Sequence, residues 1–411
     1  MATLFLRSVT ALGTLSLVAA AILLMPRTAS AQATTSSHSS FDFNTDGISF
    51  ATADSSSKVM MRFRMQNTAT VTTKSVDDLS FASTDWAVRR LRIRFGGHLV
   101  DPRLTFNLQL SFARGDLDYT DTQFPNIVRD AMIFWNFSPR LQVSFGQTKL
   151  PGNRQRVISS ADIQFPDRSI VNSAFTLDRD FGFQGFWRPV DGDVIVNLRG
   201  AISSGDGRNQ PAIPGGGLAY TGRAEILPFG SFLKGGDYFE GDLLREPAPK
   251  VSVGLSFQHN ENQTRTRGSL GAKLYEQRTA QTLYADALLK YSGLAVYCEY
   301  ARRRSDDPLT RSSDGKVAAV FVGHGMLAQV TYCFPFMFEV GTRFARVVPD
   351  DDLKMLPEGF TDQTTSLNLG YYLNKHRVKM QIELGRGDRE VLATDVKSAF
   401  YFGRFNMELG I

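Results

Sequence analysis

The chain contains few cysteines and, after its first residues, no long apolar run. Only two of its 411 residues are cysteine. Cys298 and Cys333 fall on opposite faces of the strands predicted below, so we expect no disulfide between them. No stretch after Met25 approaches the roughly 18 consecutive apolar residues of a transmembrane helix. The sequence therefore excludes both a disulfide-stapled scaffold and a bundle of transmembrane helices.

Motifs of enzymes and metal sites are also missing. There is no GxSxG element, no Walker loop and no paired cysteine motif. Residues 42–47 match the opening of a calcium-binding EF-hand loop, but Ala53 stands where a bidentate glutamate is needed. The only local serine, histidine and acid group, Ser256, His259 and Glu261, has nothing that distinguishes it from a strand end. We therefore expect no enzyme, no metal site and no cofactor.

The first 31 residues have the pattern of a secretory signal peptide. Arg7 precedes an apolar stretch at 11–25, and residues 29–31 have the small-x-small form of a cleavage site. The apolar stretch is too short for a stable membrane anchor. We expect 1–31 to be removed after export and 32–57 to form a polar leader and an N-terminal turn.

From residue 58 to residue 411, apolar and polar side chains alternate with the period of two that belongs to β-strands. The composition of 42% hydrophobic and 21% charged residues suits strands that expose half of their side chains to water. About sixteen segments show this alternation: 58–70, 84–98, 103–113, 128–137, 140–148, 181–189, 193–202, 218–227, 249–259, 281–291, 294–301, 322–333, 336–345, 363–373, 376–385 and 399–410.

The links between these segments are short and long in turn, which is typical of periplasmic turns and outer loops. The fold predicted is therefore all-β, a transmembrane antiparallel β-barrel of about 16 strands with long outer loops and short periplasmic turns. The link 228–248 does not fit, because it should be short and is long. It is either a periplasmic insertion or the place where the strand count slips.

Arginines gather on one face of the first two strands. Arg90, Arg92 and Arg94 alternate with apolar residues in the second strand, and Arg62 and Arg64 do so in the first. If the apolar faces meet lipid, the five guanidinium groups line the lumen about 7 Å apart along each strand, twice the rise per residue. Such a row would let an anion pass from one arginine to the next. The alternative is that these arginines only pair with lumen carboxylates and hold the barrel in shape. The carboxylates considered are Glu299, Glu339, Glu383 and Glu408.

The longest link, 149–180, is the predicted constriction, because long outer loops that fold inward set the pore diameter in such barrels. Arg154 and Arg156 lack close acidic neighbours in the sequence and are the residues expected to line the narrow part. The alternative is an exposed loop of mixed charge. Other basic groups, the arginines at 302–304 together with Arg265 and Arg267, are expected in outer loops, where they contact lipopolysaccharide phosphates or attract anions to the mouth of the pore.

Five stretches together resemble the family of phosphate-selective porins O and P. They are Arg89 to Arg94, Phe145 to Pro151, Arg179 to Gly182, Phe338 to Phe344 and Leu369 to Asn374. The resemblance implies a homotrimeric barrel in the outer membrane of a Gram-negative bacterium, with the third outer loop folded inward.

The expected function is that of an outer-membrane porin passing small anions, phosphate or polyphosphate among them, by passive diffusion along the lumen arginines. The alternatives are a general porin without selectivity and a non-conducting structural or adhesive barrel. The expected partners are small anions, membrane lipid and lipopolysaccharide, with no nucleic acid.

Overall fold

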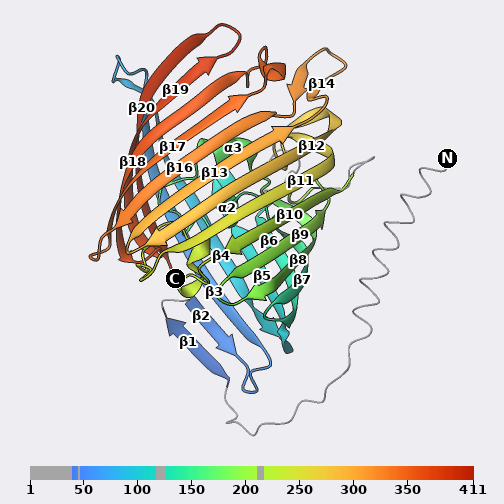
Figure 1. Cartoon of the computed structure of the whole chain (residues 1–411), viewed down its shortest axis with the longest axis vertical. Helices are drawn as coiled ribbons and strands as arrows, with labels where there is room; N and C mark the ends of the chain where they lie inside the picture. The colour runs from blue at the N-terminus through green and yellow to red at the C-terminus, as the bar shows by residue number, and fades with distance from the viewer. Residues whose placement is uncertain (1–38, 45–46, 117–125, 211–216) are drawn as a thin grey trace, which may run out of the picture. The chain divides into compact units, whose positions relative to one another are not determined.

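The computed structural model describes residues 39–44, 47–116, 126–210 and 217–411 (Figure 1). The predicted signal peptide lies outside the described residues. The strands are β1 Ser40–Asn44, β2 Gly47–Ala51, β3 Lys58–Thr73, β4 Phe81–Leu99, β5 Asp101–Ser111, β6 Val128–Ser138, β7 Leu141–Lys149, β8 Arg179–Asp191, β9 Ile195–Ser203, β10 Ala219–Leu227, β11 Lys250–Arg267, β12 Leu270–Tyr291, β13 Leu294–Arg304, β14 Leu309–Arg311, β15 Val317–Ala319, β16 Gly323–Cys333, β17 Phe338–Pro349, β18 Phe360–Asn374, β19 Val378–Val391 and β20 Val396–Gly410. The short helices are η1 Arg114–Asp116, α2 Arg154–Val157, α3 Ile170–Phe175, η2 Leu233–Tyr238 and η3 Asp351–Leu353.

Eighteen strands form one antiparallel sheet, and sixteen of them, β3 to β13 and β16 to β20, close into a barrel. The barrel closes where β20 pairs with β3, with Glu408 opposite Gln66. Each of the sixteen predicted strands overlaps one of these strands, so the predicted barrel is confirmed. The segment 228–248 does not mark a slip in the count, because β10 and β11 on either side of it pair directly.

The alternation of side chains explains why these segments form barrel strands. In β16, Gln329 and Thr331 are buried on the inner face, whereas Val330 and Tyr332 are 42% and 37% exposed on the outer face. An outer face of apolar residues is stable only against lipid, so the pattern matches a strand that crosses a membrane. No helix in the described part of the chain is long and apolar enough to span a bilayer.

The N-terminal segment differs from its prediction. Part of the expected leader forms the hairpin of β1 and β2, and β2 pairs with the first residues of β3 (Figure 1). Phe50 faces Phe41 across the hairpin, with ring centroids 5.0 Å apart. Each strand has only five residues, so their alternation is too short to stand out among the polar residues around them. The hairpin of β14 and β15 was missed for the same reason.

The two cysteines are free thiols, as predicted. Cys298 is exposed on the outer face of β13, and Cys333 is buried on the inner face of β16. Among the described residues no cluster of histidine, cysteine and acidic side chains could hold a metal ion.

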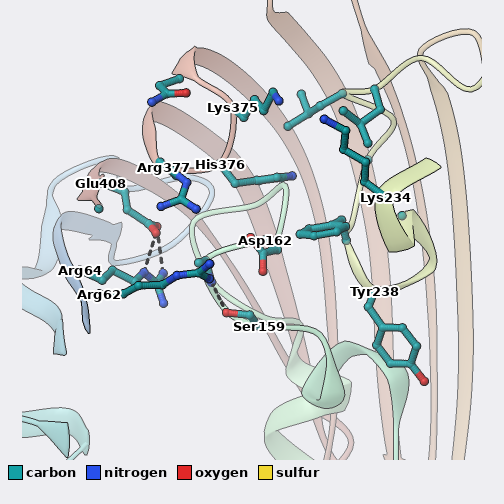
Figure 2. Close-up of a pocket in the computed structure, with 18 of the residues that line it drawn as sticks. Arg62, Arg64, Ser159, Asp162, Lys234, Tyr238, Lys375, His376, Arg377 and Glu408 are labelled. Carbon is teal, nitrogen blue, oxygen red and sulfur yellow. Dashed lines mark hydrogen bonds and ion pairs between the residues drawn. The ribbon is translucent and has the colours of Figure 1, made fainter. Parts of the chain in front are cut away.

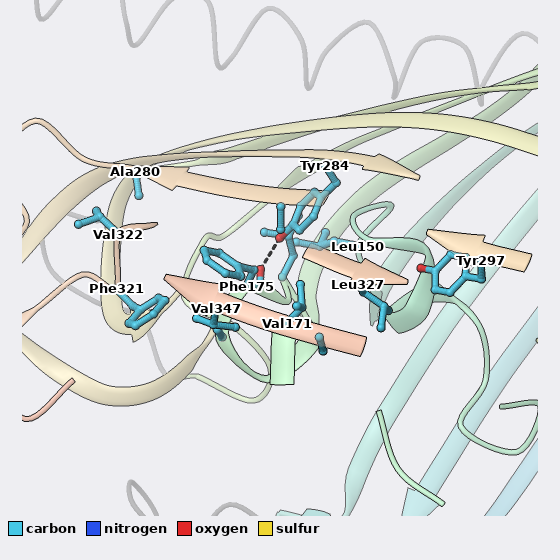
Figure 3. Close-up of a cluster of buried hydrophobic side chains, with 14 of the residues drawn as sticks. Leu150, Val171, Phe175, Ala280, Tyr284, Tyr297, Phe321, Val322, Leu327 and Val347 are labelled. Carbon is cyan, nitrogen blue, oxygen red and sulfur yellow. Dashed lines mark hydrogen bonds between the residues drawn. The ribbon is translucent and has the colours of Figure 1, made fainter. Parts of the chain in front are cut away.

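An apolar cluster fills part of the lumen near the outer loops (Figure 3). Val171 and Phe175 of α3 pack with Phe321 from the segment between β15 and β16, and the hydroxyl of Tyr284 on β12 donates to the carbonyl oxygen of Phe175. Burial of these side chains holds α3 against the wall of β12 to β18. The open part of the lumen is therefore displaced toward the opposite wall.

Candidate functional site

The arginines of β3 and β4 face one another across the two strands. In the observed register Arg62 lies opposite Arg94, Arg64 opposite Arg92, and Gln66 opposite Arg90. All five arginines lie on the inner face, where they line cavities or contact the residues of the 150–178 segment.

Three of these arginines pair with carboxylates. The Arg64 Nε lies 2.5 Å from Glu408 Oε1, the Arg90 Nη2 lies 2.8 Å from Asp167 Oδ1, and Arg92 pairs with Asp116. Of the four carboxylates that the alternative interpretation proposed, Glu408 pairs with Arg64.

Arg94 is different. Its Nε donates to the amide oxygen of Asn107 at 2.5 Å, and no described carboxylate lies within ion-pair distance of it. Arg62 lines two of the lumen cavities beside Arg94. The arginine wall therefore keeps uncompensated positive charge at Arg94.

The segment 150–178 lies inside the barrel and contacts strands on several sides of the lumen. Lys379 of β19 donates to the carbonyl oxygen of Ala161 at 2.7 Å, and Gln66 of β3 donates to that of Pro166 at 3.0 Å. Arg303 of β13 donates to that of Ala174 at 3.1 Å. These bonds fix backbone that has no partners in regular secondary structure.

Arg154 does not line an open passage, so this prediction was wrong. The side chain is fully buried, with its Nε 2.5 Å from Asp286 Oδ1 and its Nη2 3.2 Å from Glu225 Oε1. Arg223 pairs with the same two carboxylates at 2.7 and 2.8 Å. The two arginines and two carboxylates form a neutral buried cluster that fastens α2 to β10 and β12.

Arg156 lies at the edge of a second cavity of about 230 Å³, here called the basic chamber. The premise that this arginine lacks an acidic neighbour was wrong, because it pairs with Asp178. Seven basic side chains line the basic chamber, and Asp130 is the one acidic residue among the described residues of its lining. The seven are Arg92, Arg94, Arg129, Lys149, Arg156, Arg168 and Arg179.

Three carboxylates, Asp116, Asp130 and Asp178, form the ion pairs of this chamber, and they reach only four of the seven cations. Lys149 and Arg168 instead donate to uncharged backbone carbonyl oxygens, both reaching that of Ile158, at 3.2 and 2.8 Å. Among the described residues, the seven basic side chains of the chamber therefore outnumber the three carboxylates that pair with them.

The cations of the basic chamber lie close together and lower one another's pKa values. Burial, together with the neighbouring Arg90 guanidinium, lowers the pKa of Arg168 to about 9, which leaves it charged at neutral pH. Burial and the nearby Arg168 also hold the pKa of Arg156 well below its ordinary value. A bound anion would raise both pKa values again, because its negative charge favours the charged form of each arginine.

The sequence contained a weak signal for Lys149 and Arg168, since both lie in or beside the predicted loop. Arg168 follows Asp167 in the sequence, but the carboxylate of Asp167 pairs with Arg89 and Arg90. Arg129 lies in a predicted strand with Asp130 beside it and gave no signal of its own.

A larger cavity of about 770 Å³, here called the periplasmic vestibule, lies at the end of the barrel that holds the C-terminus and the short turns. Figure 2 shows Arg62 and Arg64 on one side of it and Lys234 and Tyr238 on the opposite side, with Asp162 between them. Eight lysine and arginine side chains and four carboxylates line it. It shares Arg92 and Arg94 with the basic chamber, so the two cavities are neighbours.

Acidification is expected to increase anion preference through Asp162, which lines the periplasmic vestibule. Burial raises the pKa of this carboxyl above its ordinary value, although Lys379 and Arg64 act to lower it. Asp162 therefore becomes neutral at a higher pH than an ordinary aspartate, and the vestibule loses a negative charge as the pH falls. Reversal potentials measured at several pH values check this.

The D162N variant should show the raised anion preference already at neutral pH and a weaker pH dependence. D77N, a change in an exposed outer segment, is the matched control. An unchanged pH profile in D162N would contradict the role of this carboxyl.

Two other expectations need correction. Arg303 is buried and holds α3, and Arg265 is buried and donates to the carbonyl oxygen of Gly271, so neither reaches lipopolysaccharide. Ser256 and His259 point to opposite faces of β11, because three residues along a strand reverse the face. They form no joint site.

Comparisons with known proteins bear on the family and the fold of the chain. Residues 59–199 match the model of the phosphate-selective porin O and P family. No curated protein sequence matches the chain.

Several solved structures share the fold. An anion-selective porin from Comamonas acidovorans superposes with a TM-score of 0.51 at 12% identity, covering 86% of this chain and 100% of that one. OmpF of Salmonella typhi in complex with daunomycin gives a TM-score of 0.54 at 14% identity, with 87% and 98% covered. A trimer form of OmpT, an outer membrane protein of Vibrio cholerae, gives 0.51 at 12% identity, with 86% and 99% covered.

The family match carries more weight than the structural likeness, since identities of 10 to 14% show the fold alone. The matched residues 59–199 include the arginine strands β3 and β4 and the inward segment 150–178. Over residues 59–199 the chain thus resembles the phosphate-selective porins O and P, and it has the fold of the porin barrels of the Gram-negative outer membrane.

Proposed function

We propose that this porin passes small anions, phosphate or polyphosphate among them, by passive diffusion. The observation that carries the proposal is the basic chamber, a cavity whose described lining has seven cations and one carboxylate. Arginine suits oxyanions because it stays charged at physiological pH and presents a planar fork of donors.

The proposed route runs from the periplasmic vestibule to the basic chamber. Arg62 and Arg64 line the vestibule, Arg92 and Arg94 line both cavities, and Arg156 lines the chamber. Same-face residues along a strand are about 7 Å apart, so an anion can contact the next guanidinium before it leaves the last. Several sites of similar strength avoid one deep well that would trap the ion.

Charge is divided between the two sides of the lumen. The buried carboxylates of β10, β12, β13 and β17 face the 150–178 segment, where Glu225 binds Arg154, Glu299 accepts from Asn153, and Glu339 accepts from Gln164. These carboxylates are covered by the segment, whereas the arginines of β3 and β4 border open cavities. An ion in the open lumen therefore meets mainly positive charge.

The 150–178 segment is the proposed constriction. It supplies Arg156 and Arg168 to the basic chamber and covers the acidic wall, so it both narrows the lumen and selects the sign of the charge. Assembly as a homotrimer is a further proposal, supported by the trimer form of one protein with this fold. Exposed Arg267 and Arg304 are the basic residues proposed to contact lipopolysaccharide.

Proteoliposomes test the proposed function. Vesicles containing the folded protein are expected to take up labelled phosphate faster than labelled rubidium, because phosphate is favoured by the cations of the basic chamber. Equal rates for both ions would indicate a general porin. Rates equal to those of protein-free vesicles would indicate a non-conducting barrel, and both results contradict the proposal.

A further inference from the structure

The two cavities differ in their apolar lining. In the basic chamber, Val157 is the one large apolar side chain among the described lining residues. In the periplasmic vestibule, the segment 228–248 adds Tyr238, Phe239, Leu243 and Leu244 opposite the arginines. Contact with an apolar wall does not stabilise a bare inorganic ion, whereas it stabilises a ligand that removes apolar surface from water.

The apolar wall is held in place before any ligand enters. Lys290 Nζ donates to the carbonyl oxygen of Gly236 at 2.7 Å, and Asp242 Oδ2 accepts from the backbone N–H of Gly293 at 2.7 Å. Glu246 Oε1 accepts from the backbone N–H of Leu233 at 2.7 Å. The first two bonds tie the segment to β12 and to the turn that follows it, and the third holds the segment together internally.

The same segment also meets the inward loop. The backbone N–H of Glu240 donates to the carbonyl oxygen of Asp162 at 2.8 Å, and Glu240 Oε2 accepts from the backbone N–H of Gln164 at 3.1 Å. The two segments together bound a cavity of about 770 Å³, within the range of roughly 300 to 1,000 Å³ that is usual for sites of small organic ligands.

We propose that the periplasmic vestibule binds organic anions that carry an oxyanion head on an apolar body. The head contacts Arg62 and Arg94, and the body lies against Leu243 and Leu244. The inference rests on the proposed anion channel and adds a substrate class to it. Phosphate esters, carboxylates and sulfonates with hydrocarbon groups share this chemistry, since each joins a negative head to a body that gains from leaving water.

Two sulfonates with the same head test the proposal. Methanesulfonate and naphthalene-2-sulfonate are both ionised at any working pH, and they differ in the apolar body. Block of chloride current through single channels in a planar bilayer is recorded for each. The naphthalene compound is expected to block half of the current at a concentration at least tenfold lower, and equal blocking concentrations would overturn the inference.

Variants locate the effect in the vestibule. L244N is expected to raise the blocking concentration of naphthalene-2-sulfonate severalfold and to leave that of methanesulfonate unchanged. The control is L233N, which changes an exposed leucine of the same segment that is not part of the cavity lining. Wild-type block in L244N would also overturn the inference. The reversal potential in a chloride gradient is recorded on the same channels. A cation-selective reversal potential would refute the proposed anion channel itself. An anion-selective channel that does not discriminate between the two sulfonates would refute the organic-anion site alone.

Discussion

Replacing Arg92 and Arg94 together by glutamine is expected to lower the preference for chloride over potassium roughly tenfold. Each arginine charge stabilises an anion at about 4 Å by about 1 kcal/mol in water, and salt screens part of this interaction. Both side chains line the periplasmic vestibule and the basic chamber. The loss of Arg92 does not leave Asp116 unpaired, because Arg129 Nη1 lies 3.0 Å from its Oδ1. The permeability ratio of the two ions in a planar bilayer is the measurement.

R140Q is the matched control. Arg140 is an exposed arginine of a periplasmic turn that pairs with Asp191, and it lines neither cavity. Its replacement removes one positive charge, where R92Q/R94Q removes two, and should leave the permeability ratio as in the wild type. An unchanged ratio in R92Q/R94Q would place the filter elsewhere, in the 150–178 segment.

Replacing Arg154 by methionine is expected to loosen the 150–178 segment and widen the channel. The change leaves two buried carboxylates, Glu225 and Asp286, with one buried arginine, Arg223, while Arg199 reaches Glu225 only at 4.0 Å. Breaking a buried ion cluster by removal of one partner costs about 3 to 5 kcal/mol. Single-channel conductance should rise, on the order of twofold, because an inward loop sets the diameter of such pores.

A compensating variant separates charge from side-chain volume. R154M/D286N leaves Arg223 with Glu225 as a neutral pair, so conductance and heat resistance should return toward the wild-type values. A wild-type conductance and thermal midpoint in R154M would contradict the role given to this cluster.

The barrel could be predicted because its signal is local. A strand that faces lipid on one side and water on the other has a period of two that is visible within about ten residues. This is why all sixteen barrel strands were found, while the five-residue strands β1 and β2 were not. The same alternation predicted which side chains of β3 and β4 face the lumen.

The partners of the lumen charges could not be predicted, because they depend on contacts between distant residues. Arg154 is separated by 71 residues from Glu225 and by 132 from Asp286. Arg154 has no close acidic neighbour in the sequence but is ion-paired in the structure, whereas Arg168 follows Asp167 and donates to the carbonyl oxygen of Gln155. The position of the 228–248 segment in the lumen could not be predicted for the same reason, because its hydrogen bonds go to the distant residues Gly293 and Asp162.

The most direct measurement of charge selectivity is the reversal potential of the folded wild-type protein in a planar bilayer with a tenfold gradient of potassium chloride. The excess of cations in the basic chamber predicts discrete current steps and a reversal potential with the sign of the chloride equilibrium potential. A reversal potential with the sign of the potassium equilibrium potential would contradict the proposed anion pathway. The absence of current steps would contradict it as well.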